Sequence, residues 1–154
     1  DGTDVLYVER RESPTALAVF RGVGGRNVAH ATSTGKVLLA HLDPDEQSQL
    51  VRSMRLTRKT GYTITNRTAL LHELAEVRRR GYAENIFESE AGMVSIAAPI
   101  RGRTGHVVAA MSVAGAVPPG DPEPMRRFIR PLIEAAEQVS HNLGWRRPGH
   151  GDAR

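Results

Sequence analysis

The sequence predicts a single α+β domain in which helices pack against an antiparallel sheet. The chain has 154 residues, 40% of them hydrophobic and 25% charged, which is the size and composition of one globular domain. Two strongly apolar, β-like segments, residues 93–100 and 107–114, are separated by a short loop that contains Gly102 and Gly105. This arrangement is typical of a β-hairpin, whose strands pair antiparallel. Helical periodicity elsewhere supplies the layers that cover such a sheet.

The first part of the chain alternates between short β-like segments and helical ones. Ser13-Pro14 separates the first two predicted strands, and a glycine-rich turn precedes the third. Hydroxyl side chains precede the first helical run, as N-caps do, and Pro44 suits the first position of the second helix. We expect strands over 4–9, 15–21 and 26–30, and helices over 34–41 and 43–54.

The later elements carry equally clear end signals. Asn66 or Thr68 is the predicted N-cap of a helix that ends before Gly81, where three arginines suit its negative end. A strand is predicted over residues 82–88. The last helix is predicted from about Pro122 to Asn142. We expect residues 1–144 to form the domain and residues 145–154 to form a flexible basic tail.

Composition excludes several classes of protein. Cysteine is absent, which excludes disulfides, thiolate nucleophiles and cysteine-ligated zinc and favours a reducing, cytoplasmic compartment. No apolar run approaches the roughly 20 residues of a membrane helix, and no signal-peptide pattern is present, so no membrane partner is expected. The net charge is +4, but the arginines are spread out and aromatics are 5%. An arginine-rich solvated surface is therefore favoured over a nucleic-acid platform.

The predicted hairpin places small and polar side chains on one face. A symmetric turn at 103–104 would set Ser95 opposite Ser112 and Met93 opposite Ala114. Two facing hydroxyls with little bulk between them predict a hollow with hydrogen-bonding walls. The alternative is a solvent-exposed face with ordinary serines. The opposite face is apolar and is the expected core: Val94, Ile96, Ala98, Val107, Ala109, Met111 and Val113.

The segment 32–36 (TSTGK) opens the first predicted helix. A helix start leaves several N–H groups without intrahelical acceptors at the positive end of the helix dipole, which suits an anion. Gly35 would allow close approach of a ligand. Simple N-capping is the alternative. A Walker A loop is excluded, because His30 and Val37 occupy its glycine and hydroxyl positions.

Signals for catalysis are weak. The six histidines show no metal-binding spacing, and no Gly-x-Ser-x-Gly motif occurs. Glu84, Glu88 and Glu90 could pose as paired acids, although a solvated edge is the favoured interpretation. His30 near Ser33 could imitate a serine–histidine pair, but proximity in sequence is poor evidence for one. We therefore expect no enzyme, no metal and no cofactor.

Several separated motifs follow one another along the chain. They are HATSTGKVLLA at 30–40, TITN at 63–66, RRRGYA at 78–83, SIAAPI at 95–100 after Gly92, and VVAAMSV at 107–113. Over residues 4–144 this series resembles the C-terminal effector-binding domain of the IclR family of bacterial transcription regulators. The resemblance implies a GAF-like fold, a curved antiparallel sheet of about six strands flanked by helices. It also implies a homodimer or tetramer, and DNA binding only through an N-terminal winged helix-turn-helix that this chain does not include.

The same resemblance implies a site for a small organic or aromatic acid. It assigns the ligand carboxylate to the backbone N–H groups of Ser33 and Thr34, at the start of the helix that contains Gly35. Side-chain hydrogen bonds would come from Asn85, Ser95 and Ser112, and an apolar wall from Met93.

This chain departs from the family pattern at three of these positions. Asn85 stands where Asp is frequent, Ser95 where Cys is frequent, and Ala114 where a second Ser is frequent. A neutral Asn and the space beside Ala114 favour a bulkier, partly apolar acid. Two alternative functions stay open: a small hydrolase that uses Ser95 or Ser112 with His30, and an oligomerisation module with a vestigial pocket.

Overall fold

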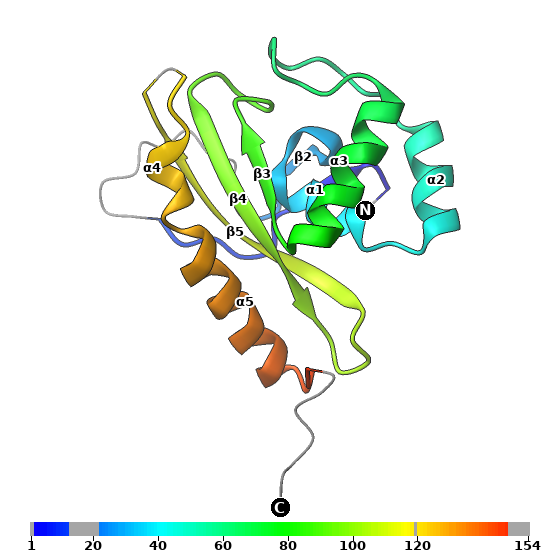
Figure 1. Cartoon of the computed structure of the whole chain (residues 1–154), viewed down its shortest axis with the longest axis vertical. Helices are drawn as coiled ribbons and strands as arrows, with labels where there is room; N and C mark the ends of the chain where they lie inside the picture. The colour runs from blue at the N-terminus through cyan, green and yellow to red at the C-terminus, as the bar shows by residue number, and fades with distance from the viewer. Residues whose placement is uncertain (1, 13–21, 119, 148–154) are drawn as a thin grey trace, which may run out of the picture.

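The computed structural model describes residues 2–12, 22–118 and 120–147 (Figure 1). Its elements confirm the α+β class. In chain order they are β1 (Asp4–Leu6), β2 (Arg26–Val28), the 3-10 turn η1 (Ala29–Ala31), α1 (Ser33–Ala40), α2 (Pro44–Ser53), α3 (Arg67–Arg80), β3 (Ala83–Ile86), β4 (Met93–Arg101), β5 (Val107–Ala116), α4 (Glu123–Arg126) and α5 (Ile129–Asn142).

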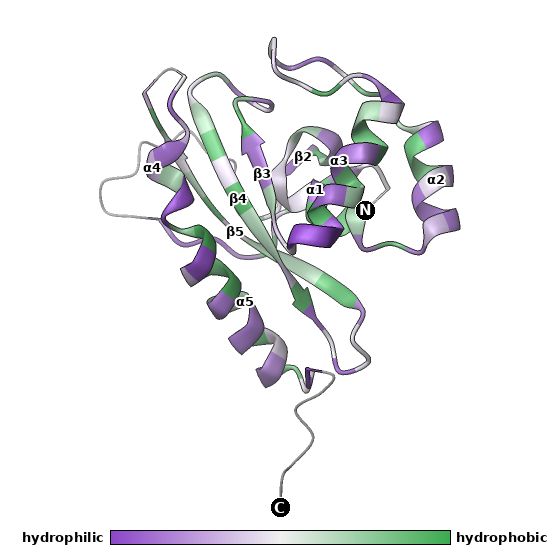
Figure 2. Cartoon of the chain, viewed as in Figure 1, coloured by the Kyte–Doolittle hydropathy of each residue, from purple (hydrophilic) through white to green (hydrophobic). Residues whose placement is uncertain are grey.

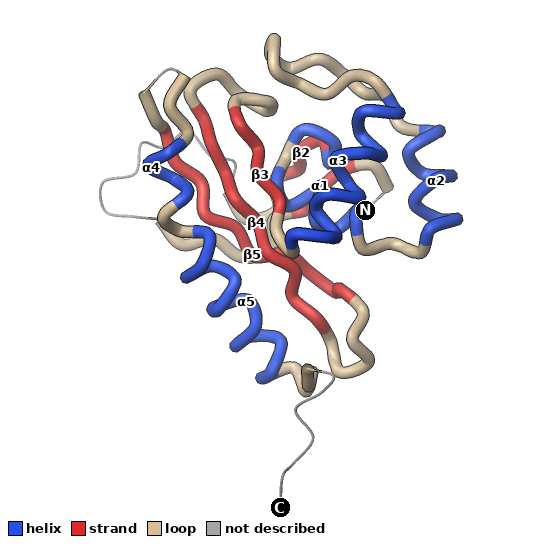
Figure 3. The backbone as a smooth tube through the Cα atoms, in the orientation of Figure 1, coloured by secondary structure: helices blue, strands red, loops and turns tan. Residues whose placement is uncertain are grey.

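The five strands of the described ranges form two antiparallel sheets, instead of one sheet of about six strands. β1 pairs with β2, and β4 lies between β3 and β5 in the larger sheet. The strand predicted over residues 15–21 lies outside the described residues. Figure 3 shows α5 on one side of the larger sheet and α1 with α3 on the other.

Both faces of β4 are buried. One face packs with α5 around Val94, Ile96 and Leu132, as the apolar pattern predicted. The other face packs with α1, where Ala97 joins a second apolar cluster that includes Val37. Figure 2 shows the apolar side of α5 turned toward the sheet. The face that carries Ser95 is therefore covered by a helix along β4.

The helix ends follow their predicted chemistry. The Asp43 side chain accepts a hydrogen bond from the Asp45 N–H ahead of Pro44, and Asn66 caps α3 by accepting from the Ala69 N–H. Gly81 ends α3 with φ of 83°, a conformation that costs glycine little because it lacks a Cβ.

The prediction of one helix from Pro122 to Asn142 is wrong. The helix is interrupted between α4 and α5, with a turn at Arg127 and Phe128. Pro131 has no N–H to donate to the preceding turn, so a continuous helix would lose a hydrogen bond there. With α5 beginning at Ile129, Pro131 lies in its first turn, where that N–H has no intrahelical acceptor.

The chain remains packed beyond Asn142. The Trp145 N–H donates to the Ser140 carbonyl at 3.0 Å. The indole ring lies 5.4 Å from the His141 ring and 6.0 Å from the Arg101 guanidinium carbon. These contacts hold Trp145 at the end of α5, and the rest of the expected tail, residues 148–154, lies outside the described part. No helix in the described part is long and apolar enough to cross a membrane.

Candidate functional site

The register of the β4–β5 hairpin differs from the predicted one. Ser95 lies opposite Ala114, and Ser112 lies opposite Ala97. The loop is centred on residue 104, and an irregularity between Ile100 and Arg101 adds a further one-residue shift. Because the total displacement is two residues, every side chain keeps its predicted face while its partner changes.

The predicted site residues divide into a buried group and an exposed pair. Met93 and Ser95 on β4 are buried. Ser112 and Ala114 on β5 are exposed. The two serines therefore do not face each other across a shared hollow, which corrects the expected pairing.

Ser33 brings the start of α1 to the sheet. Its hydroxyl lies 2.8 Å from that of Ser95, and both side chains are buried. Ser95 is also the strand partner of Asn85 on β3. The structure thus brings together Ser33, Asn85 and Ser95, three of the predicted residues, from three separate elements. Thr34 is buried at the next position of α1.

In the first turn of α1, two backbone N–H groups have no hydrogen-bond acceptor among the described residues. Thr32 is the N-cap, and its Oγ1 accepts from the Gly35 N–H at 3.2 Å. Among the hydrogen bonds of the described ranges, none has the N–H of Ser33 or Thr34 as its donor. These amides lie at the positive end of the helix dipole, where a negative group is stabilised.

Gly35 allows close packing between α1 and the preceding 3-10 turn. A Cβ at this position would lie 2.1 Å from the Ala29 carbonyl oxygen, far inside van der Waals contact. The close approach allowed by the missing side chain is therefore that of the protein's own η1 backbone. The expected role of Gly35 at a ligand stays a prediction.

Asn85 holds the turn that follows β3. Its Oδ1 accepts from the backbone N–H groups of Glu88 at 2.8 Å and Ser89 at 3.3 Å. Its Nδ2 donates to the Ser89 hydroxyl at 2.7 Å. The amide of Asn85 therefore shapes the wall beside Ser95.

Sequence reasoning missed a buried ionic network beside this cluster. The Lys36 side chain is 2% exposed and lies 2.5 Å from the Glu88 carboxylate and 3.6 Å from that of Glu73. Glu73 in turn pairs with Arg80 at 2.9 Å. The prediction that Glu88 lies on a solvated edge is wrong, since it is 7% exposed. Burial raises the pKa of Glu88, and Lys36 opposes that shift. The signal available in the sequence was a lysine inside an otherwise apolar helical run.

Within the described residues, no hydrogen bond joins the His30 ring to a candidate serine. Its Nε2 bonds to the Thr57 carbonyl at 3.1 Å, and the ring is buried. Burial lowers its pKa, and the bond to Thr57 opposes this. The hydroxyl of Ser33 bonds to Ser95 instead. The geometry thus places no base on a serine, and the hydrolase interpretation is not favoured.

Two cavities accompany this arrangement. One of about 270 Å³ lies beside Lys36, Tyr62 and Glu88. The other, of about 290 Å³, is lined by Gly35 and by apolar residues of β1, α1 and α2. The described residues contain no group of three or more His, Cys, Asp or Glu side chains that could hold a metal ion.

The whole arrangement matches a known family of proteins. Residues 1–141 match the family model for the bacterial transcriptional regulator IclR C-terminal domain. The HTH-type transcriptional regulator KdgR of Escherichia coli is 34% identical over 145 residues, which cover 94% of this chain and 55% of that protein. This chain thus spans about half the length of the curated relatives it matches.

Solved structures agree with this match. The inducer-binding domain of a PobR double mutant from Acinetobacter, in complex with 3-hydroxybenzoic acid, is 32% identical with a TM-score of 0.81. That likeness covers 91% of this chain and 83% of that one. An IclR homologue from Microbacterium hydrocarbonoxydans, complexed with 4-hydroxybenzoate, is 31% identical with a TM-score of 0.81, covering 93% and 57%. The chain therefore belongs to the IclR family of bacterial transcriptional regulators, and its residues 1–141 correspond to the C-terminal domain of that family.

Proposed function

We propose that this chain is the ligand-sensing domain of an IclR-type transcription regulator and that it binds a small organic or aromatic acid without catalysing a reaction. The ligand carboxylate would lie at the start of α1, against the N–H groups of Ser33 and Thr34. Ser95, Asn85 and Met93 would border it from the sheet.

The observation that carries this proposal is a surplus of buried hydrogen-bond donors. Neither amide at the start of α1 has an acceptor among the described residues. The hydroxyls of Ser33 and Ser95 share one hydrogen bond. One hydroxyl donates to the other, and the O–H of the second remains available to a ligand. A carboxylate offers several lone pairs and a charge that the helix dipole favours. An anion is therefore the chemistry that completes this cluster.

The family supports an aromatic acid as the ligand class. Two structural neighbours carry hydroxybenzoates. Asn85 is neutral, so it does not repel a carboxylate as an aspartate would. The small side chain of Ala114 lies opposite Ser95 and would obstruct a ring less than a larger residue would.

Regulation would follow from unequal binding to two arrangements of an oligomer. A ligand shifts such an equilibrium only by its difference in affinity for the two states. We expect a homodimer or tetramer in the cytoplasm, with DNA contact made by a separate winged helix-turn-helix domain of the complete regulator.

A thermal-shift panel tests the proposal. Benzoate, 3- and 4-hydroxybenzoate and pyruvate are compared with benzyl alcohol, a neutral analogue. Saturation at a hundred times the Kd stabilises the folded state by about 2.7 kcal/mol. At least one acid should raise the melting temperature while the alcohol does not. Absence of any shift across a wide panel of acids would leave an oligomerisation module as the better description.

A further inference from the structure

The cavity of about 270 Å³ borders the ionic network of Lys36 and Glu88, beside the proposed effector cluster but with a different lining. It opens between α3, the loop that carries Tyr62 and β3, which is an edge strand of the larger sheet in the described residues. None of the eight predicted effector residues lines it. Its properties therefore bear on a separate site.

The cations of this cavity are already engaged by the protein. Lys36 Nζ contacts Glu88 Oε1, the Glu84 carbonyl at 3.0 Å and Glu73 Oε1. Arg80 donates to Glu73 Oε1 at 2.9 Å and to the Tyr82 carbonyl at 2.8 Å. An anion entering the cavity would have to displace these contacts.

One carboxylate that lines this cavity has an oxygen without a hydrogen-bond partner among the described residues. Glu84 is paired with Arg126 at 3.1 Å and Glu73 with Arg80 at 2.9 Å. Among the ion pairs of the described residues, Glu88 has Lys36 as its one basic partner. Within the described ranges, Glu88 Oε2 is the buried side-chain atom that has no hydrogen-bond partner, and Glu88 is 7% exposed. A buried acceptor left unpaired costs free energy that a donor can recover. The raised pKa of Glu88 agrees with this, because one lysine does not offset the burial of its charge.

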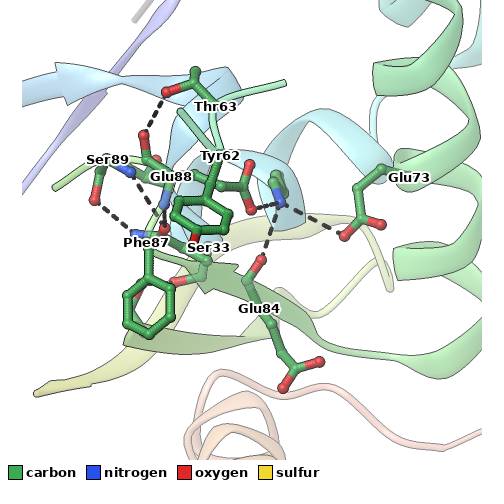
Figure 4. Close-up of polar contacts among 12 residues, drawn as sticks. Ser33, Tyr62, Thr63, Glu73, Glu84, Phe87, Glu88 and Ser89 are labelled. Atoms are coloured by element: carbon green, nitrogen blue, oxygen red, sulfur yellow. Dashed lines mark hydrogen bonds and ion pairs between the residues drawn. The ribbon is translucent and has the colours of Figure 1, made fainter. Parts of the chain in front are cut away.

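An apolar wall completes the cavity. Ile64 and Ile86 line it, and Tyr62 is 67% exposed. The Tyr62 ring meets Phe87 edge-on at 5.6 Å (Figure 4 shows both rings). An aromatic ring at this position attracts an organic cation through its π face. The described residues show no metal-binding group, so a molecular cation fits better than a metal ion.

We propose that this cavity is a second ligand site that takes a primary organic ammonium with a small apolar body. The ammonium would donate to the Glu88 carboxylate, and the apolar body would lie against Tyr62 and Ile64.

Isothermal titration with 2-phenylethylammonium and its neutral counterpart 2-phenylethanol tests the site. The ammonium should bind at least tenfold more tightly than the alcohol, both with and without saturating 4-hydroxybenzoate. Equal affinity of the two probes, or binding of neither, would overturn the proposal. Loss of ammonium binding when 4-hydroxybenzoate is added would also overturn it, because both compounds would then share one site.

Two variants and a control locate the binding. Tyr62→Ala alters an exposed side chain and should weaken ammonium binding severalfold, whereas Val108→Ala, which alters another exposed side chain on β5, should not. Glu88→Gln should weaken it tenfold or more. If Glu88→Gln does not fold, amide chemical shifts of the unmodified protein decide. Ammonium should move the signals of residues 62–64 and 84–88, and movement confined to other segments would refute the assignment.

Discussion

Replacing Ser33 by proline isolates the contribution of a single backbone N–H to effector binding. Ser33 is the first residue of α1, where proline is tolerated because this N–H has no intrahelical acceptor. The preceding residue, Thr32, has φ of −120° and ψ of 146°, which is the extended conformation that a following proline requires. The variant should therefore fold, and Thr32 should still cap the helix.

The matched control is Ser33→Ala. Both variants lose the hydroxyl that contacts Ser95, but only the proline variant loses the amide donor. A hydrogen bond to a charged group contributes about 1.5–3 kcal/mol. At 1.4 kcal/mol for each factor of ten, Ser33→Pro should bind the acid about ten- to 150-fold more weakly than Ser33→Ala.

Isothermal titration with 4-hydroxybenzoate measures this difference at constant pH and salt. Circular dichroism and a melting curve establish that both variants are folded. Equal affinity of the two variants for the acid would refute the idea that this amide holds the carboxylate. If both variants lose the same amount of affinity relative to the unmodified protein, the Ser33 hydroxyl, and not the N–H, contributes to binding the acid.

Three further outcomes follow from the packing and the charges. Gly35→Ala should lower the free energy of unfolding by several kcal/mol in urea titrations, because the new Cβ meets the Ala29 carbonyl oxygen at 2.1 Å. Lys36→Met should cost about 3–5 kcal/mol, since it leaves the Glu88 carboxylate buried without its charged partner. His30 has a pKa lowered by burial, so the unfolded chain binds the proton more readily. Stability should fall as the pH drops below about 6.5 toward the folded pKa, and His30→Gln should flatten that slope in acid titrations followed by fluorescence.

Each of these substitutions has a matched control at an exposed position, where the free energy of unfolding should change little. Gly61→Ala adds a Cβ into open space, Lys59→Met removes an exposed charge, and His106→Gln alters an exposed ring. Wild-type stability in Gly35→Ala or Lys36→Met would contradict the packing argument. An unchanged acid slope in His30→Gln would show that this ring is not the group that titrates.

Local chemistry made much of the fold predictable. A capping side chain and a glycine with positive φ act within one helical turn, so Asn66 and Gly81 marked the ends of α3 directly. The hairpin register was not predictable to the residue. It depends on the irregularity beside Ile100, which no strong turn signal marks. Alternation still placed Ser95 and Ser112 on the correct face, because a displacement of two residues preserves it.

The candidate site was predictable in part for a related reason. The free N–H groups of Ser33 and Thr34 are predictable from where α1 begins, because the first N–H groups of any helix lack intrahelical acceptors. The ionic network instead depends on segments far apart in the chain. Lys36 and Glu88 are 52 positions apart, and only tertiary packing places them together. The role of Gly35 was likewise invisible, since it depends on how closely η1 approaches α1.

The basic side chains beside β3 also control how the sheet can grow. An outer strand with free carbonyls invites another chain to add a strand of its own. Here the Lys36 ammonium donates a hydrogen bond to the Glu84 carbonyl, and the Arg80 guanidinium donates one to the Tyr82 carbonyl. Two backbone carbonyls at this edge of the sheet therefore already accept hydrogen bonds from side chains. A strand added along this part of β3 would first have to displace these two side chains.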